Sequence, residues 1–155
     1  MKVEDFMVKD VISVRPISSI KDVMTTFVEK KIGGVPIVDE NGMLAGMVTD
    51  GDILRAFKPI DRRIQDYISF ITYIAEEALE ERLEEMAKVQ VIRVAKTKGI
   101  VTVHPNDEMK TVVTLLAKHH FKKLPVIDKD NHVVGVISRG DVIRRIQETV
   151  VKRME

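Results

Sequence analysis

The sequence contains one pattern twice, with a constant separation of 89 residues between the copies. The heptapeptide Gly-Met-Val-Thr-Asp-Gly-Asp at 46–52 is matched by Gly-Val-Ile-Ser-Arg-Gly-Asp at 135–141. The register holds without a gap from residues 14–55 to residues 103–144. A register kept over this length indicates two copies of one structural unit, and this strongly limits the folds that the chain can adopt.

Within each copy, the spacing of hydrophobic residues changes in the same order. In the first copy it predicts a strand at 11–14, a helix with its apolar stripe at 20–28, strands at 35–38 and 44–48, and a helix that begins at Asp52. The second copy repeats these elements 89 residues later. One such unit is too small to cover both faces of its sheet. We therefore predict an α/β (α+β) fold in which two β-α-β-β-α modules pack together.

Two short segments in each copy resemble a known family. One reads hydrophobic-Pro-hydrophobic-hydrophobic-Asp, and the other reads Gly-hydrophobic-hydrophobic-(Thr or Ser)-x-Gly-Asp. Together they resemble the cystathionine β-synthase (CBS) domain family. This resemblance implies a tandem pair whose modules pack through their sheets with pseudo-two-fold symmetry and form two clefts at their seam. The expected division is a first CBS module at 1–57, a helical linker or insertion at 58–90, a second CBS module at 91–150 and a C-terminal tail at 151–155.

The insertion is longer than a typical connection and keeps a helical spacing of hydrophobic residues, which predicts one helix over 64–88. Its opposite side is acidic and is either solvated or a docking surface for a second chain or a basic partner. Residues 1–89 hold 12 basic and 17 acidic residues, a net charge of −5, whereas residues 90–155 hold 13 and 7, a net charge of +6. The glutamates of the acidic side are Glu76, Glu77, Glu80, Glu81, Glu84 and Glu85.

The segments Thr49-x-x-Asp52 and Ser138-x-x-Asp141 are the strongest candidates for a ligand site. A hydroxyl and free backbone N–H groups at a helix N-terminus can donate hydrogen bonds to a phosphate, and the helix dipole favours the anion. A carboxylate in the same turn can accept two hydrogen bonds from a ribose diol. The alternative is that both aspartates only cap their helices. The resemblance to CBS pairs favours the nucleotide role, because matching positions in nucleotide-binding members contact ribose and phosphate.

The remaining site candidates lie in the first strands and around the hydrophobic-Pro segments. The first-strand residues supply edges for an adenine ring and the segments with proline supply its walls, although core packing accounts for part of the role of Val35 and Leu124. Lys122 and Lys123 neutralise phosphate where the first copy has two glycines, and Arg139 stands where the first copy has Asp50. The cleft with Ser138 and Asp141 is therefore expected to bind better. The candidates beyond those already named are Val11, Ser13, Gly33, Gly34, Pro36, Thr97, Gly99, Ile100, Thr102 and Pro125.

Catalytic and metal-binding classes are disfavoured. No nucleophile–base set, P-loop or Gly-x-Gly-x-x-Gly motif is visible, so a non-enzymatic protein is expected. We interpret the four histidines as surface or helix-end residues without a metal or a neighbouring carboxylate cluster, although His119 and His120 are candidates to approach a bound phosphate. The chain has no cysteine, no apolar run near the ~20 residues that span a bilayer and no recognisable export signal, so a cytoplasmic location is expected. The histidines are His104, His119, His120 and His132.

The sequence therefore predicts a stand-alone CBS pair that senses an adenine nucleotide, AMP above all, with ADP, ATP and S-adenosylmethionine as competitors. Because no effector domain is visible, the regulated target is expected to be another protein, or the same chain in a disk-like homodimer. Two alternatives stay open: an interaction or scaffold module with closed clefts, and a nucleic-acid binder. The second would use the basic residues Arg144, Arg145, Lys152 and Arg153, but aromatic content is only 5%.

Overall fold

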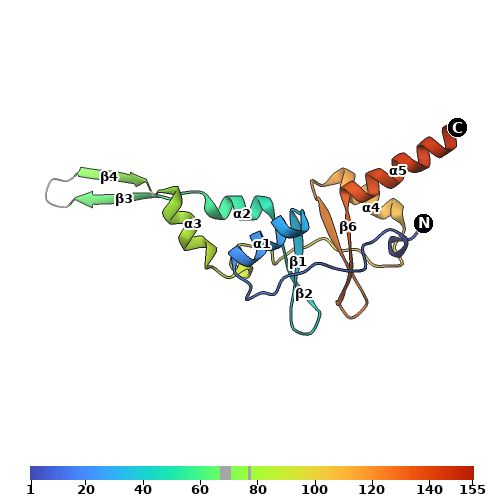
Figure 1. Ribbon diagram of the computed structural model, residues 1–155, viewed down its shortest axis with the longest axis horizontal. Coiled ribbons are helices and arrows are strands. Elements are labelled where there is room, and N and C mark those ends of the chain that lie inside the picture. Colours follow the sequence, from blue (N-terminus) through green and yellow to red (C-terminus); the bar gives the residue numbers. More distant parts are fainter. Residues whose placement is uncertain (67–70, 77) are drawn as a thin grey trace.

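A computed structural model describes residues 1–66, 71–76 and 78–155, and it divides into two similar modules placed side by side (Figure 1). Each module has a two-stranded antiparallel sheet between two helices in the chain. The first module consists of α1 (Ile20–Lys30), β1 (Gly34–Val38), β2 (Leu44–Thr49) and α2 (Asp50–Phe57). The second module consists of α4 (Met109–Lys118), β5 (Lys123–Ile127), β6 (Val133–Ser138) and α5 (Arg139–Met154). The repeated order predicted from the sequence is confirmed for these eight elements.

The strand predicted at the start of each copy is much shorter than expected. Val14 forms a single parallel bridge with Ile37, and Val103 forms the equivalent bridge with Val126. The X-Pro that follows each segment limits further pairing, because proline cannot donate a backbone hydrogen bond. The segments at 11–14 and 100–103 therefore add one bridged residue each to their sheets and are otherwise irregular.

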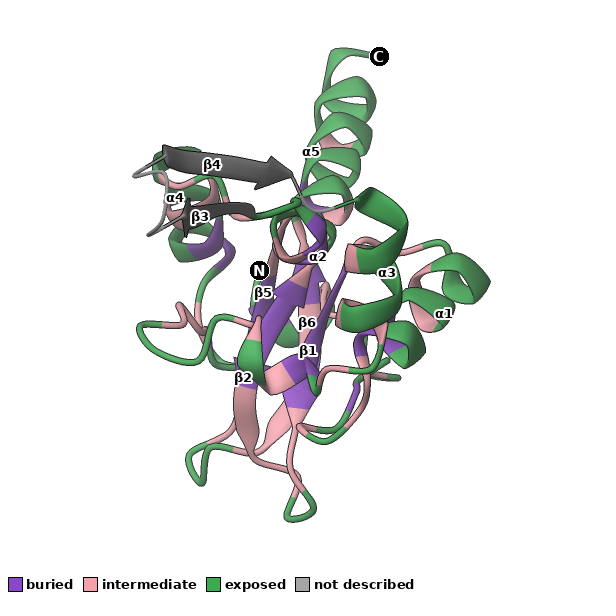
Figure 2. Cartoon of the chain, turned by 90° about the vertical axis from the view of Figure 1, so that its left-hand side faces the viewer, coloured by how far each residue is buried: buried purple, intermediate pink, exposed green. Residues whose placement is uncertain are grey.

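Each module has its own hydrophobic core, shown in purple in Figure 2. Ile20 and Ile37 are fully buried in the first core, and Leu124 and Ile137 are buried in the second. Valine and isoleucine on the inner face of each sheet meet the apolar stripe of the preceding helix, so strand and helix cover one another. At the C-terminal ends of β2 and β6, Thr49 and Ser138 cap the helices α2 and α5.

The segment that precedes each module packs against the other module. Val3, in a short 3-10 helix (Val3–Asp5), is fully buried in the second core, and its N–H donates to the carbonyl of Asp107 at 2.9 Å. Val91, in the matching 3-10 helix (Val91–Arg93), is fully buried in the first core. Two antiparallel bridges, Val8 with Val136 and Lys96 with Met47, continue this exchange. The two modules are therefore joined by these exchanged segments as well as by the surface along which they meet.

The single helix predicted over 64–88 is wrong. The structure instead has an antiparallel pair, β3 (Asp61–Asp66) and β4 (Ile71–Glu76), followed by α3 (Leu79–Ala87). Residues 61–76 contain four isoleucines and three aromatic residues, and β-branched and aromatic residues favour strands. The helix forms only where leucine, glutamate, arginine, methionine and alanine follow one another, all of which favour helices. Residues 67–70 and 77 of the predicted helix lie outside the described residues.

The new helix α3 is held against the first module. It contacts α1 and α2, and the Nε of Arg82 donates to the carbonyl of Ala56 at 3.0 Å. No helix in the described part of the chain is long and apolar enough to cross a membrane.

Candidate functional site

Two clefts open at the seam between the modules, and each is built from both modules. The first cleft, about 330 Å³, combines Thr49 and Asp52 of the first module with Ile100 and the 122–125 segment of the second. The second cleft, about 260 Å³, combines Ser138 and Asp141 with Val11 and Pro36 of the first module. Each cleft thus takes its Thr/Ser-x-x-Asp turn from one module and its apolar wall from the other.

This arrangement corrects the expected grouping of charged residues. Lys122 lies in the cleft of Thr49 and Asp52, not in that of Ser138 and Asp141. Arg139 is exposed and lines neither of these two clefts. The comparison of the two copies matched their residues correctly but placed Lys122 in the wrong cleft, because each cleft crosses from one copy to the other, and Lys123 lines both.

Most of the candidate residues do line these clefts. The first cleft contains Gly33, Gly34, Thr49, Asp52, Ile100, Lys122, Lys123, Leu124 and Pro125. The second contains Val11, Gly34, Pro36, Lys123, Ser138 and Asp141. Six candidates line neither: Ser13, Val35, Thr97, Gly99, Thr102 and Arg139. Val35 is 1% exposed, so the core-packing role accounts for it.

Several lining residues were not candidates at all. Met47, Arg55 and Lys96 line the first cleft, together with Phe121. Lys96 arrives there because its backbone pairs with Met47 across the exchange of segments, which the repeat pattern does not reveal. His120 also lines the first cleft, in the position considered for it from the sequence.

The Thr49 and Asp52 side chains close a capping box at the start of α2. The backbone N–H of Asp52 donates to Thr49 Oγ1 at 3.4 Å, and the Asp52 carboxylate accepts from the backbone N–H of Thr49 at 2.9 Å. Its other oxygen, Oδ1, is 2.6 Å from the Arg55 guanidinium. The helix cap is therefore Thr49, and Asp52 stands three residues further on rather than at the cap itself. The capping role is real, yet Asp52 Oδ1 faces only an exposed arginine that can move aside for a ligand.

The equivalent turn of the second module is similar. Ser138 Oγ donates to Asp141 Oδ2 at 2.6 Å and accepts from Asp141 N at 3.1 Å. Arg144 lies 3.6 Å from the Asp141 carboxylate. Both turns thus present a carboxylate whose first function is to fix a helix start, with one oxygen directed toward an exposed arginine.

The two clefts differ in charge. The first cleft has four cationic side chains, those of Arg55, Lys96, Lys122 and Lys123, against two carboxylates, those of Asp50 and Asp52. The second has Lys123 alone against Asp10 and Asp141. An anionic ligand is therefore attracted to the first cleft, the reverse of the order expected from the sequence.

Two lysines of the 122–125 segment connect the modules. Lys122 Nζ lies 3.5 Å from Asp50, but both side chains are more than half exposed, so this ion pair is weak and easily exchanged. Lys123 is partly buried, lines both clefts and donates from Nζ to the carbonyl of Gly34 at 3.0 Å. Burial lowers the pKa of Lys123, and the nearby Asp141 carboxylate offsets part of that effect.

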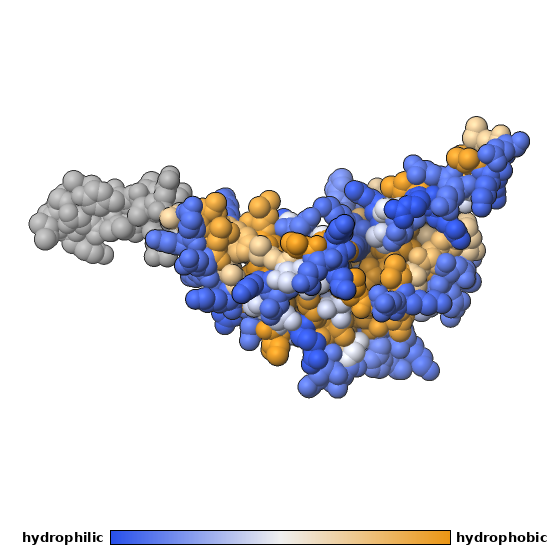
Figure 3. All heavy atoms as spheres, in the orientation of Figure 1, coloured by the Kyte–Doolittle hydropathy of each residue, from blue (hydrophilic) through white to orange (hydrophobic). Residues whose placement is uncertain are grey.

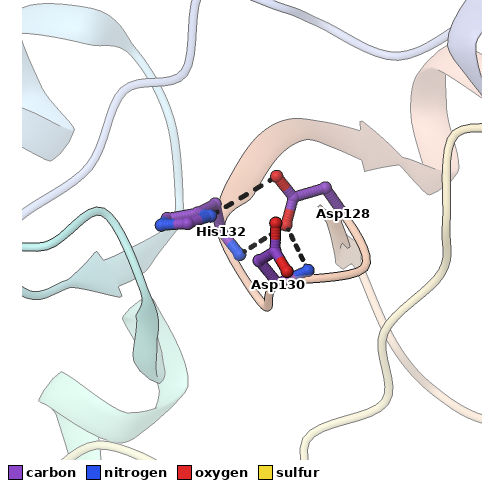
Figure 4. Close-up of side chains that lie close together, drawn as sticks. All are labelled: Asp128, Asp130 and His132. Atoms are coloured by element: carbon purple, nitrogen blue, oxygen red, sulfur yellow. Dashed lines mark hydrogen bonds and ion pairs between the residues drawn. The ribbon is translucent and has the colours of Figure 1, made fainter.

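One histidine does have carboxylate neighbours, contrary to the expectation from the sequence. The ligand atoms of His132, Asp128 and Asp130 lie within 4.8 Å of one another at the tip of the β5–β6 hairpin (Figure 4). Backbone hydrogen bonds from His132 and Asp130 hold the pKa of Asp128 below its usual range. Asp39 accepts the same pair of backbone hydrogen bonds in the first module, so the aspartate at this position serves the turn.

The fold and the composite clefts define a tandem pair of small α/β modules with two clefts at their seam. The family model for the CBS domain matches residues 3–59 and 91–148. The chain therefore belongs to the CBS domain family, with two CBS domains in tandem.

Two relatives identified by sequence illustrate the family. The chain is 29% identical over 137 residues to the chloroplastic CBS domain-containing protein CBSX2 of Arabidopsis thaliana, which covers 84% of this chain and 56% of that protein. It is 25% identical over 154 residues to the uncharacterized protein MJ1426 of Methanocaldococcus jannaschii, covering 94% of this chain and 91% of that protein. The chain thus spans just over half the length of CBSX2 and nearly the whole of MJ1426.

Solved structures agree with the fold. The crystal structure of CBSX2 in complex with AMP superposes with a TM-score of 0.72 and 26% identity, covering 96% of this chain and 97% of that one. CBS-pair structures of this kind have the same mixed arrangement of helices and small sheets.

Proposed function

We propose that the chain is a regulatory module that binds an adenine nucleotide at the seam between its CBS modules, AMP above all. The observation that carries this proposal is the first cleft, which has a volume of about 330 Å³. It is lined by Thr49 and Asp52 of the first module and by Lys122 and Lys123 of the second. The hydroxyl, the helix N-terminus and the lysines suit a phosphate, and the Asp52 carboxylate suits a ribose diol. The complex of the related CBSX2 with AMP supports the choice of ligand.

The apolar part of the first cleft suits the adenine ring. Met47, Ile100, Val101 and Leu124 provide hydrophobic surface beside the polar turn. Gly33 and Gly34 also line this cleft, and a Cβ on Gly33 would lie 2.8 Å from Asp50 Oδ2, so the glycine lets that carboxylate approach the backbone. A nucleotide held in this way contacts both modules, so its binding energy depends on how the modules sit against each other. A partner protein that contacts both modules can read that change, and regulation of a separate target is the proposed output.

Thermal unfolding with a panel of adenosyl ligands tests the proposal. With a Kd near ~10 μM, AMP at ten times Kd should raise the free energy of unfolding by about 1.4 kcal/mol. The panel includes ADP, ATP and S-adenosylmethionine, with GMP as a control that keeps the ribose and phosphate. Absence of a shift with every adenosyl ligand contradicts nucleotide sensing and favours a ligand-free scaffold module.

Lys122 should act on the phosphate in the first cleft. Replacing it by alanine is expected to weaken AMP binding about fivefold, because one exposed ammonium–phosphate contact is worth ~1 kcal/mol. Adenosine lacks the phosphate, so its affinity should not change. Isothermal calorimetry at two salt concentrations measures both ligands, and added salt should weaken AMP alone.

The control for Lys122 is Arg139→Ala, which removes a cation at the start of α5 that lines neither of the two clefts. It should leave AMP affinity unchanged. A loss for adenosine equal to that for AMP in Lys122→Ala means that Lys122 supports the fold. A larger loss in Arg139→Ala restores the site order expected from the sequence.

We also propose that the module works as a homodimer. Each module exposes an apolar groove between its helices, and single-domain proteins seldom leave two such grooves uncovered. Sedimentation of the purified chain tests this statement.

A further inference from the structure

One lysine lies where the two clefts meet. Among the described residues, only Gly34 and Lys123 line both clefts. They occupy matching positions, 89 residues apart, as the first residues of β1 and β5. Each pairs across its sheet with the hydroxyl residue of one turn, Gly34 with Thr49 and Lys123 with Ser138. The second module therefore places an ammonium between the two turns, and the matching position of the first module has no side chain.

The Lys123 side chain reaches from the second module to the first. Its Nζ donates to the carbonyl of Gly34 at 3.0 Å, and a Cβ on that glycine would lie 3.8 Å from Lys123 Cδ. An ammonium has three donors, so two remain for groups in the clefts. Burial lowers the pKa of Lys123, and the Asp141 carboxylate of the second cleft opposes this effect. A partly buried ammonium gains more from a phosphate than an exposed lysine does.

The charge of each cleft depends on which of them uses this ammonium. With it, the first cleft has four cations and two carboxylates, a lining charge of +2, and without it the lining charge is +1. The second cleft has Lys123 against Asp10 and Asp141, a lining charge of −1, which becomes −2 without the lysine. The first cleft thus stays attractive to a phosphate when it loses Lys123, whereas the second keeps carboxylates only.

The surroundings strengthen this effect. In the space-filling view, hydrophilic side chains at the middle of the molecule have hydrophobic surface on both sides (Figure 3). Charges beside apolar surface are screened less than charges on an open polar surface. One displaced ammonium therefore changes the affinity for an anion by a measurable factor.

We propose that the two clefts compete for Lys123, so that an anionic nucleotide bound in one cleft weakens the binding of a second one in the other. The inference rests on the proposed nucleotide binding and names how the two sites regulate each other. A phosphate in the first cleft draws the ammonium to itself, and the second cleft then offers its ligand Asp10 and Asp141 without a cation. The effect is reciprocal, because coupling between two binding equilibria is the same in both directions. The module then responds to the nucleotide in two separate concentration ranges.

Calorimetry measures this coupling when one cleft is closed. Ile100→Trp enlarges a side chain on the apolar wall of the first cleft, and Ile100 does not line the second cleft. The AMP affinity of this variant is the affinity of the second cleft while its neighbour is empty. We expect it to be at least about tenfold tighter than the second AMP-binding step of the wild type.

Two lysine variants assign the coupling. In the Lys123→Met background, the affinity measured with Ile100→Trp and the second AMP-binding step should agree within about twofold, because no ammonium is shared. Lys122→Met is the matched control, since Lys122 lines the first cleft and not the second, and it should keep the tenfold difference. Equal affinities in Ile100→Trp and in the second step of the wild type overturn the inference. A difference that survives Lys123→Met also overturns it.

A second pair of variants at Gly34 gives a test that does not depend on the folding of Ile100→Trp. A Cβ on Gly34 meets its neighbours at 3.6–3.8 Å, which is ordinary contact. Gly34→Lys supplies a second ammonium, so the second AMP should bind about tenfold more tightly than in the wild type. Gly34→Met has a similar length without the charge and should bring no such gain. An equal effect of the two substitutions overturns the inference.

The same titrations separate this inference from the proposed function. If the wild type binds no AMP, nucleotide sensing is contradicted and the competition for Lys123 is contradicted with it. If the wild type binds two AMP molecules and Gly34→Lys and Lys123→Met leave the ratio of the two affinities unchanged, nucleotide binding stands and only the shared ammonium is contradicted.

Discussion

Replacement of Val3 by aspartate is expected to destabilise the protein by about 3–5 kcal/mol, because it places an unpaired carboxylate in a hydrophobic core. Val3 is fully buried, although it stands before the first repeat in the sequence. Its neighbours in the core, including Val103 and Leu124, belong to the second module. The expected loss follows only if the N-terminal segment is an integral part of that module.

Urea unfolding of the full chain measures this effect, with Val8→Asp as the control. Val8 lies on the same segment and is 49% exposed, so the same substitution should cost less than about 1 kcal/mol. Its backbone bonds with Val136 do not depend on the side chain. Equal losses in the two variants, or no loss in Val3→Asp, contradict the exchange of segments between the modules.

The repeat made most of the fold predictable, because two copies of one hydrophobic pattern support each other. Ser19 caps α1 and accepts a hydrogen bond from Asp22 N, at the start of the helix predicted over 20–28. The residues between the copies had no second copy to confirm them. The spacing of their isoleucines fitted a helix, and the prediction followed this spacing instead of the preference of β-branched residues for strands.

The composition of the clefts was harder to predict than the fold. A repeat relates Lys122 to Gly33 and Asp50 to Arg139, but it does not state which copies meet across a seam. The structure places Lys122 3.5 Å from Asp50, so a lysine of the second copy faces a carboxylate of the first. Packing between residues far apart in the sequence decides such contacts, and a local pattern in one sequence does not show which residues meet.

This cross-pairing changes which cleft should bind first. Four cations line the first cleft and one lines the second, so the tightest AMP binding is expected at Thr49 and Asp52. Asp52→Ala should weaken that binding by about 1.5–3 kcal/mol, because it removes charge-assisted hydrogen bonds to the ribose diol. Asp141→Ala, the same change in the other repeat, should leave the tightest site within about twofold of wild type.

The ligand 2′,3′-dideoxy-AMP distinguishes the diol contact from the helix cap. It lacks both hydroxyls, so Asp52→Ala should barely change its affinity if the carboxylate acts on the ribose. The capping box of α2 is also lost in this variant, and a general disturbance of the turn would weaken both ligands equally. Calorimetry of AMP and its dideoxy analogue on the wild type and both variants gives the six affinities needed. If Asp141→Ala abolishes the tightest binding and Asp52→Ala does not, the charge difference between the clefts does not determine their order.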